Sequence, residues 1–225
     1  MITLDFTVKG SFSQGGLNNG SGGAGPGNTL MGENTGGLLN AYWVFDLAGI
    51  TGPVVSATLR LGMPPFGYLS PDPTETITIF DYTGDIGVLQ DQFAHSTAAF
   101  NNLGSGNVYG SRAVSDADEP DCSAGCPGNS FVAIDIALGG ADFIDDINAA
   151  LGGLFALGGA LTSVNNADFE RIFAFSANSH PAQLIIETAP TPLPEPSSLA
   201  LAAAGIAGFG FFRGARGRAG RSPSR

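Results

Sequence analysis

The chain has 225 residues, a mass of 22.8 kDa and a formal net charge of −11. Its 34 Gly and 14 Pro make up about a fifth of the residues, while 13% are charged and 43% are hydrophobic. This composition disfavours intrinsic disorder, which goes with low hydrophobicity and many charges. It also disfavours a helical bundle, because Gly destabilises helix interiors. We therefore expect a β-rich globular domain with long loops.

Acidic and basic residues are separated along the chain. All 20 Asp and Glu residues lie at or before Glu195, whereas five of the nine basic residues follow residue 212. Residues 1–195 thus carry 4 basic residues against 20 acidic ones. Such an acidic body repels phosphate backbones, so we expect no nucleic-acid partner for it.

Alternating apolar residues predict a series of strands. The first ten residues place Ile2, Leu4, Phe6 and Val8 in alternation with polar residues, which is typical of a half-buried strand. Seven further segments are β-branched or aromatic-rich and mostly bounded by Gly, Pro or Asn. These segments are Ala41–Leu47, Val54–Leu61, Thr74–Tyr82, Val108–Val114, Ser130–Leu138, Arg171–Ala177 and Ala182–Thr188.

Within residues 1–188, helices are expected at Ser96–Leu103 and at Ala141–Leu151, and in the second segment apolar residues recur at helical spacing. Strands and helices do not alternate along the chain as they do in a fold built from βαβ units. We therefore expect an all-β fold over residues 1–188, an antiparallel β-sandwich of jelly-roll-like type with one or two short helices.

Two of the predicted strands resemble a known group of domains. Residues 41–47 (AYWVFDL), a Gly-containing turn and residues 54–61 (VVSATLRL) are similar to the DNRLRE-type and related carbohydrate-binding-like sandwich domains. Pieces at residues 155–161 and 173–176 look like parts of an uncharacterised exported domain. The resemblance implies a sandwich in an extracellular setting, and it implies no ligand.

Aromatic side chains bear on a glycan-binding alternative. Tyr42 and Trp43 are neighbours on one strand, so they must face opposite sides, and we expect only one of them, Trp43, to lie in the core. If the domain is a carbohydrate-binding module, substitution of Tyr42, Tyr68 or Tyr82 should weaken glycan binding.

Cys122 and Cys126 are the only cysteines, in the turn-rich run DCSAGCPG. Two cysteines make half a zinc site at most, and in an exported protein a local pair predicts a disulfide that pins one loop. Free thiols are the other interpretation.

The residues just before the cysteines suggest a weak Ca²⁺ site. Asp116, Asp118 and Asp121 offer oxygen ligands near one another, but Pro120 and the lack of a terminal Glu depart from an EF-hand loop. A solvated acidic loop is the alternative, and we expect no other metal or cofactor.

Catalytic motifs are not found. The chain has two His, no H-x-x-x-H or H-E-x-x-H pattern and no G-x-S-x-G elbow. We therefore expect a protein that is not an enzyme.

The C-terminal residues carry the strongest signal. Residues 189–198 form a Pro-rich linker that contains Pro194-Glu195-Pro196. Residues 199–212 (LALAAAGIAGFGFF) are without charge, and residues 213–225 hold five Arg.

Fourteen helical residues span about 21 Å, less than the ~30 Å hydrocarbon core. A core helix would fit that length, but the Arg cluster that follows favours a short membrane span with a cytoplasmic flank. Arg213, Arg216 and Arg218 would form this flank.

This order of features resembles the PEP-CTERM sorting signal of exported bacterial proteins. The resemblance implies that the C-terminal hydrophobic helix holds the chain in the inner membrane until an exosortase, a membrane-embedded cysteine transpeptidase, cuts near Pro194-Glu195-Pro196. These three residues would be recognised and would not be catalytic. Met1–Gly10 does not read as the secretory signal peptide that such proteins begin with, so we expect the natural start to lie upstream.

Together these expectations describe an exported protein of a Gram-negative cell surface or extracellular matrix. Its partners would be exosortase and, transiently, the inner membrane. The alternative is a module that binds carbohydrate, specifically exopolysaccharide.

Overall fold

The computed structural model describes residues 1–18, 28–34, 37–123, 125–126, 130–165, 169–173 and 181–190. The chain divides into two units, Met1–Ala189 and Pro190–Arg225. Only Pro190 of the second unit belongs to the described residues, so the predicted linker, hydrophobic helix and Arg-rich tail lie outside them.

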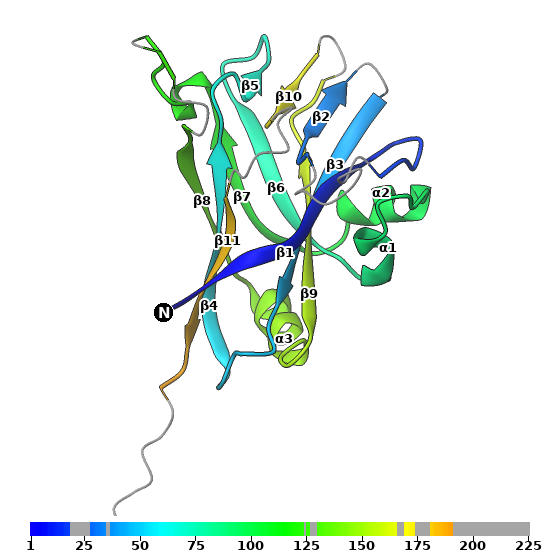
Figure 1. The fold of residues 1–225 in the computed structure, drawn as a ribbon, viewed down its shortest axis with the longest axis vertical. Helices are drawn as coiled ribbons and strands as arrows, with labels where there is room; N and C mark the ends of the chain where they lie inside the picture. Colours follow the sequence, from blue (N-terminus) through cyan, green and yellow to red (C-terminus); the bar gives the residue numbers. More distant parts are fainter. Residues whose placement is uncertain are drawn as a thin grey trace, which may run out of the picture. The chain divides into compact units, whose positions relative to one another are not determined.

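The described part of the chain is mostly β-structure with few helices, which confirms the all-β expectation (Figure 1). Its strands form one sheet in which every pairing is antiparallel. The strands are β1 (Ile2–Ser13), β2 (Met31–Asn34), β3 (Gly37–Asp46), β4 (Val54–Met63), β5 (Tyr68–Leu69), β6 (Glu75–Asp81), β7 (Val108–Val114), β8 (Val132–Leu138), β9 (Leu154–Leu161), β10 (Arg171–Ile172) and β11 (Ala182–Thr188). The helices are α1 (Ile86–Gln90), α2 (Thr97–Leu103), the 3₁₀ turn η1 (Asp116–Asp118) and α3 (Ala141–Ala149).

The sheet curls because β1 belongs to both of its halves. Residues 2–5 of β1 pair with β11, and residues 6–13 pair with β3. The register shifts between Phe6 and Val8, where the strand changes partner, and Thr7 Oγ1 donates to the Val44 carbonyl at 3.1 Å. Such irregularities bend a strand and increase its twist. One half of the sheet therefore runs β1–β11–β4–β8, and the other runs β1–β3–β9–β6–β7 (Figure 1).

The two outer strands, β7 and β8, approach each other. The Gly139 N–H donates to the Tyr109 carbonyl at 2.9 Å, and Arg112 Nη1 donates to the Asp135 carbonyl at 3.3 Å. A Cβ on Gly110 would lie 2.3 Å from the Ala137 oxygen, so the close approach requires glycine there. The curled sheet thus brings its two ends together.

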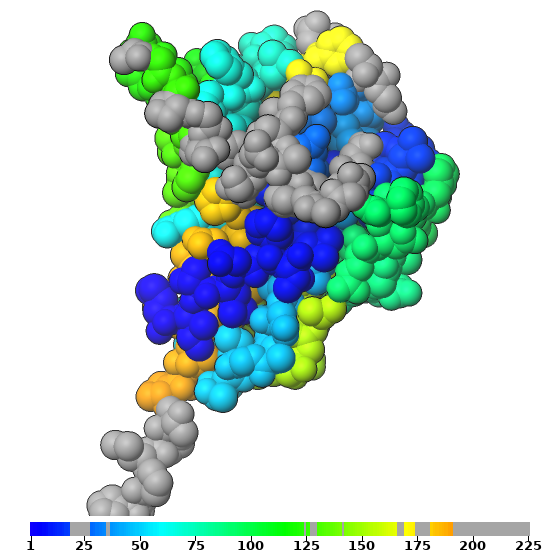
Figure 2. All heavy atoms as spheres, viewed as in Figure 1, coloured from blue at the N-terminus to red at the C-terminus, as the bar shows by residue number. Residues whose placement is uncertain are grey.

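Two apolar clusters stabilise this arrangement. The larger lies inside the curl and contains the fully buried Trp43, Phe45, Leu59, Ile77 and Leu184, which come from both halves. The smaller lies on the opposite face of β3, where α1 and α2 cover it (Figures 1 and 2). Its largest buried members are Phe12, Tyr42, Phe100, Leu89 and Leu103.

The expectation for Tyr42 and Trp43 was half right. The two side chains face opposite sides, and Trp43 lies in the main core with 1% exposure. Tyr42 is also 1% exposed, because α1 and α2 bury the second face of β3. The idea that only one of the two could be buried was therefore wrong.

Strands with clear alternation were predicted best. β7 and β11 begin and end at the predicted residues, and β3, β4, β6 and β8 agree within a few residues. The short strands β2 and β5, the strand β9 and the helix α1 were not predicted. Of the predicted strand Arg171–Ala177, the described residues include only the two-residue β10 and Phe173.

Candidate functional site

A pocket of about 310 Å³ lies beside the end of β6 and the C-terminal part of α3. Its polar lining comes from Asp81 and Tyr82 on β6 and its continuation, Tyr109 on β7 and Asp146 on α3. Phe155 of β9 contributes to the apolar part of the lining. The pocket therefore combines two carboxylates and two phenols with an aromatic surface.

Hydrogen bonds hold several of these polar groups in place. The Tyr109 hydroxyl donates to Asp146 Oδ2 at 2.5 Å, and Asp81 Oδ1 accepts the Asn107 N–H at 2.8 Å. Burial, with the hydrogen bond to Asp146 as the second cause, raises the pKa of Tyr109 well above its ordinary value. Tyr109 thus remains a neutral donor at any physiological pH. Fixed carboxylates and phenols beside an aromatic ring suit a neutral polyhydroxyl ligand.

A second polar centre consists of three carboxylates, which we call the acid cluster: Asp72, Glu75 and Glu170. One carboxylate oxygen of each lies within 4.8 Å of those of the other two. Glu75 and Glu170 are fully buried, and Asp72 is half-buried. Asp72 lies in the turn before β6, Glu75 begins β6, and Glu170 immediately precedes β10.

Neutral groups surround the acid cluster. Glu75 accepts hydrogen bonds from the Ser70 hydroxyl at 2.6 Å and from the Ser163 hydroxyl. Asn165 donates its backbone N–H to Glu170 Oε2 at 2.9 Å and its amide to Asp72 Oδ2 at 3.0 Å. These donors are uncharged, so the hydrogen bonds bring no positive charge to the acid cluster.

Sequence reasoning missed the acid cluster, although one signal was present. Glu75 is in phase with Ile77 and Ile79, whose alternation predicted the buried face of this strand. A carboxylate in phase with core residues is unusual enough to flag a site. Its partner Glu170 lies 95 residues further along the chain, and no local spacing connects the two.

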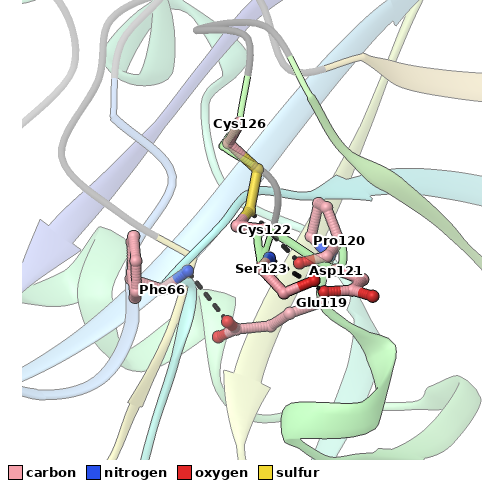
Figure 3. Close-up of a disulfide and its surroundings, with 7 residues drawn as sticks. All are labelled: Phe66, Glu119, Pro120, Asp121, Cys122, Ser123 and Cys126. Carbon is pink, nitrogen blue, oxygen red and sulfur yellow. Dashed lines mark hydrogen bonds between the residues drawn. A yellow bond between two sulfur atoms is a disulfide. The ribbon is translucent and has the colours of Figure 1, made fainter.

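The structure joins Cys122 and Cys126 in a disulfide, with a Cα–Cα distance of 4.8 Å (Figure 3). The neighbouring Glu119 accepts the backbone N–H groups of Phe66 at 2.9 Å and of Tyr68 at 2.5 Å. Phe66 has φ of 58° and is 82% exposed. Glu119 therefore connects the disulfide-bearing loop to the chain between β4 and β5.

The Ca²⁺ site considered at Asp116, Asp118 and Asp121 is not assembled. Asp118 binds Arg112 Nη2 at 2.8 Å through Oδ1 and accepts the Ser115 N–H through Oδ2, so both oxygens are engaged in the η1 turn. Asp116 and Asp121 are exposed. Among the described residues, the acid cluster is the one group of three metal-ligating side chains close enough to share an ion.

The three tyrosines of the glycan-binding alternative lie in different surroundings. Tyr42 is buried, and its hydroxyl donates to Asn18 Oδ1 at 3.2 Å, so it presents no surface to a sugar. Tyr68 is half-buried and donates to the Asp72 carbonyl at 2.6 Å. Only Tyr82 lines the pocket.

The predicted sorting residues Pro194, Glu195 and Pro196 and the flanking Arg213, Arg216 and Arg218 lie outside the described residues. Within the described part, no helix has the length and apolar character needed to cross a membrane. No protein-family model matches the chain, and none of the curated proteins compared with it matches either.

Proposed function

We propose that this chain is an exported bacterial protein of the cell surface or extracellular matrix, without enzymatic activity, sorted by a C-terminal PEP-CTERM signal. The observation that supports this proposal most strongly is the order of three C-terminal features: Pro194-Glu195-Pro196, fourteen uncharged residues and an Arg-rich end. An exosortase cuts near the Pro-Glu-Pro motif while the apolar segment holds the chain in the inner membrane. The folded body, residues 1–188, is an antiparallel β-sandwich of jelly-roll type.

Two features of the body support the proposal. A disulfide persists in an oxidising compartment and is rare in the cytosol, which agrees with Cys122–Cys126. The last strand β11 ends at Thr188, a few residues before the Pro-Glu-Pro motif. A cut at that motif would therefore leave every described strand intact.

Mass spectrometry of the C-terminal peptide tests this proposal. The protein is recovered separately from the membranes and from the medium or surface of a host that carries an exosortase. We expect a new C-terminus near residues 194–196 outside the membrane fraction. A chain found only in membranes with an intact Arg225 would mean a permanent anchor and would contradict the proposal.

A second function, carbohydrate binding, is favoured by the pocket beside Tyr82. Its carboxylates, Asp81 and Asp146, can accept hydrogen bonds from sugar hydroxyls, and the half-buried ring of Tyr82 can stack on a sugar ring. Binding to exopolysaccharide should fall at least about tenfold in Tyr82→Ala, roughly the loss of 1.4 kcal/mol. Phe66→Ala is the matched control, because Phe66 is an exposed aromatic outside the pocket. Equal binding by both variants would place any glycan elsewhere.

A further inference from the structure

We propose that Asp72, Glu75 and Glu170 bind one Ca²⁺ ion. The proposal stands on the acid cluster alone and is independent of export and of glycan binding. Two of the three carboxylates are fully buried, and one oxygen from each of the three lies within 4.8 Å of the others. Neither Arg60–Asp135 nor Arg112–Asp118, the ion pairs that join described residues, includes a member of the cluster.

Charge balance is the first step of the argument. Burying an ionised carboxylate is strongly unfavourable unless it is both hydrogen-bonded and paired with an opposite charge. Two adjacent buried carboxylates also repel each other, and a cation between them removes this repulsion. The serine and asparagine donors around the cluster are neutral and do not balance this charge.

An oxygen without a partner is the second, independent step. Glu170 is 0% exposed, and its Oε1 atom has no hydrogen-bond partner. It belongs to the same carboxylate that approaches Asp72 and Glu75. A buried acceptor left unsatisfied costs about 1–3 kcal/mol, more when it is charged. A cation coordinated by this oxygen removes the penalty.

The donor set selects the ion. All three side chains offer oxygen and none offers nitrogen or sulfur, which favours a hard cation over zinc or copper. Ca²⁺ takes six to eight oxygen ligands in flexible geometry, and the hydroxyls of Ser70 and Ser163 lie against Glu75 to extend the set. Mg²⁺ demands a tighter octahedron and keeps most of its waters.

The position of the cluster indicates what the ion does. Glu75 begins β6, and Glu170 precedes β10, which pairs with both β2 and β5. The Glu170 carbonyl also accepts the Glu33 N–H of β2 at 2.6 Å. One bound Ca²⁺ would therefore tie the ribbon β5–β10–β2 to β6, in the part of the sheet where the strands are shortest.

The full chain, first freed of metal with EGTA, provides the test. Calorimetric titration with CaCl₂ should show one ion bound per chain. Ca²⁺ at about 100 times its Kd should raise Tm by about 5–10 °C. Glu170→Gln should abolish this rise, whereas Asp116→Asn, which removes one exposed charge elsewhere, should keep it. Mg²⁺ at the same concentration should give a smaller rise.

The melting temperatures measured in EGTA distinguish a metal-binding role of Glu170 from a role as a structural hydrogen-bond acceptor. Without metal, Glu170→Gln should melt at a higher temperature than the natural chain, because one of two repelling buried carboxylates has become neutral. With Ca²⁺ the order should reverse. Absence of Ca²⁺ binding by the folded natural chain, an unchanged response in Glu170→Gln, or an equal response to Mg²⁺ would each overturn the proposal.

Discussion

Lys9 is the single lysine of the chain and lies on β1, where its side chain is 5% exposed. Its ammonium lies 4.7 Å from the centre of the Phe6 ring. Burial lowers the pKa of Lys9 to about 8 from the ordinary value of 10.5. At pH 7 the group is still protonated, so the folded state holds a partly desolvated positive charge that destabilises it.

The pH dependence of stability follows from that pKa. Between pH 8 and about 10.5 the unfolded chain holds the Lys9 proton and the folded chain has released it. The free energy of unfolding should therefore rise across this window, by up to about 3 kcal/mol. The tyrosines act oppositely at higher pH: burial raises the pKa of Tyr42 to about 12, so above pH 10 only the unfolded state ionises and stability falls.

Urea unfolding at pH 7, 8, 9 and 10 measures this effect. Lys9→Met should be more stable than the natural chain at pH 7 and should show no rise between pH 8 and 10. Arg60→Met, which removes a cation exposed to solvent, serves as the control and should retain the rise. An equal rise in Lys9→Met would mean that another group is responsible.

Among the elements, β9 shows how two glycines permit close packing on both faces of one strand. A Cβ on Gly158 would lie 2.5 Å from the Leu103 oxygen at the end of α2. A Cβ on Gly159 would lie 2.7 Å from the Trp43 ring. The first glycine admits the helix on one side, and the second admits the largest core side chain on the other.

Alanine at either position should destabilise the fold. We expect a loss of about 1–3 kcal/mol for Gly159→Ala, where the Trp43 ring must shift, and a larger loss for Gly158→Ala, where the obstacle is backbone. Gly153→Ala is the control, because the atom nearest to its new Cβ, the Ala150 oxygen, would lie at an ordinary 3.6 Å. Chemical unfolding measures the three values. A Gly158→Ala chain as stable as the control would contradict the packing described for α2.

The same glycines explain why β9 escaped prediction. Gly weakens a strand and supplies no alternating side chain, so residues 154–161 lack the period-two pattern that identified β7 and β11. Backbone pairing with β3 and β6 on its two sides holds β9 in the extended conformation that its own sequence favours only weakly. Likewise, the two-residue strand β10 is held by pairing with β2 on one side and β5 on the other, and β5 pairs with β10.

At the scale of the whole molecule, the boundary between the two units makes a prediction of its own. The backbone N–H of Ala189 donates to the Pro53 carbonyl at 2.8 Å, immediately after β11. A chain that stops after Pro190 retains this bond and all the described strands. Its Tm should lie within about 2 °C of that of the full chain.

Comparison of the two chains by circular dichroism and calorimetry checks this expectation. The truncated chain should also be lost from membranes when both are expressed with the same export signal, because it lacks residues 199–212. A fall in Tm well beyond a few degrees would mean that the C-terminal residues help to stabilise the body.

What the sequence determined by itself is local or compositional. The alternation of apolar residues predicted most long strands, the composition predicted an all-β fold, and the C-terminal motif suggested a sorting signal that remains a prediction. These conclusions hold because each depends on residues that are close in the chain. Cys122 and Cys126 belong to the same class, since five consecutive residues contain the pair.

The tertiary structure decided which residues from distant parts of the chain lie together. It buried Tyr42 as well as Trp43, because α1 and α2 cover a face that the strand pattern had left open. It brought Glu170 to Glu75 and left Asp116, Asp118 and Asp121 apart, although the latter are far closer in sequence. Proximity in the chain limits only how far apart two side chains can be. Which carboxylates share one place in space is set by the pairing of strands across the whole fold, and a single sequence does not state that pairing.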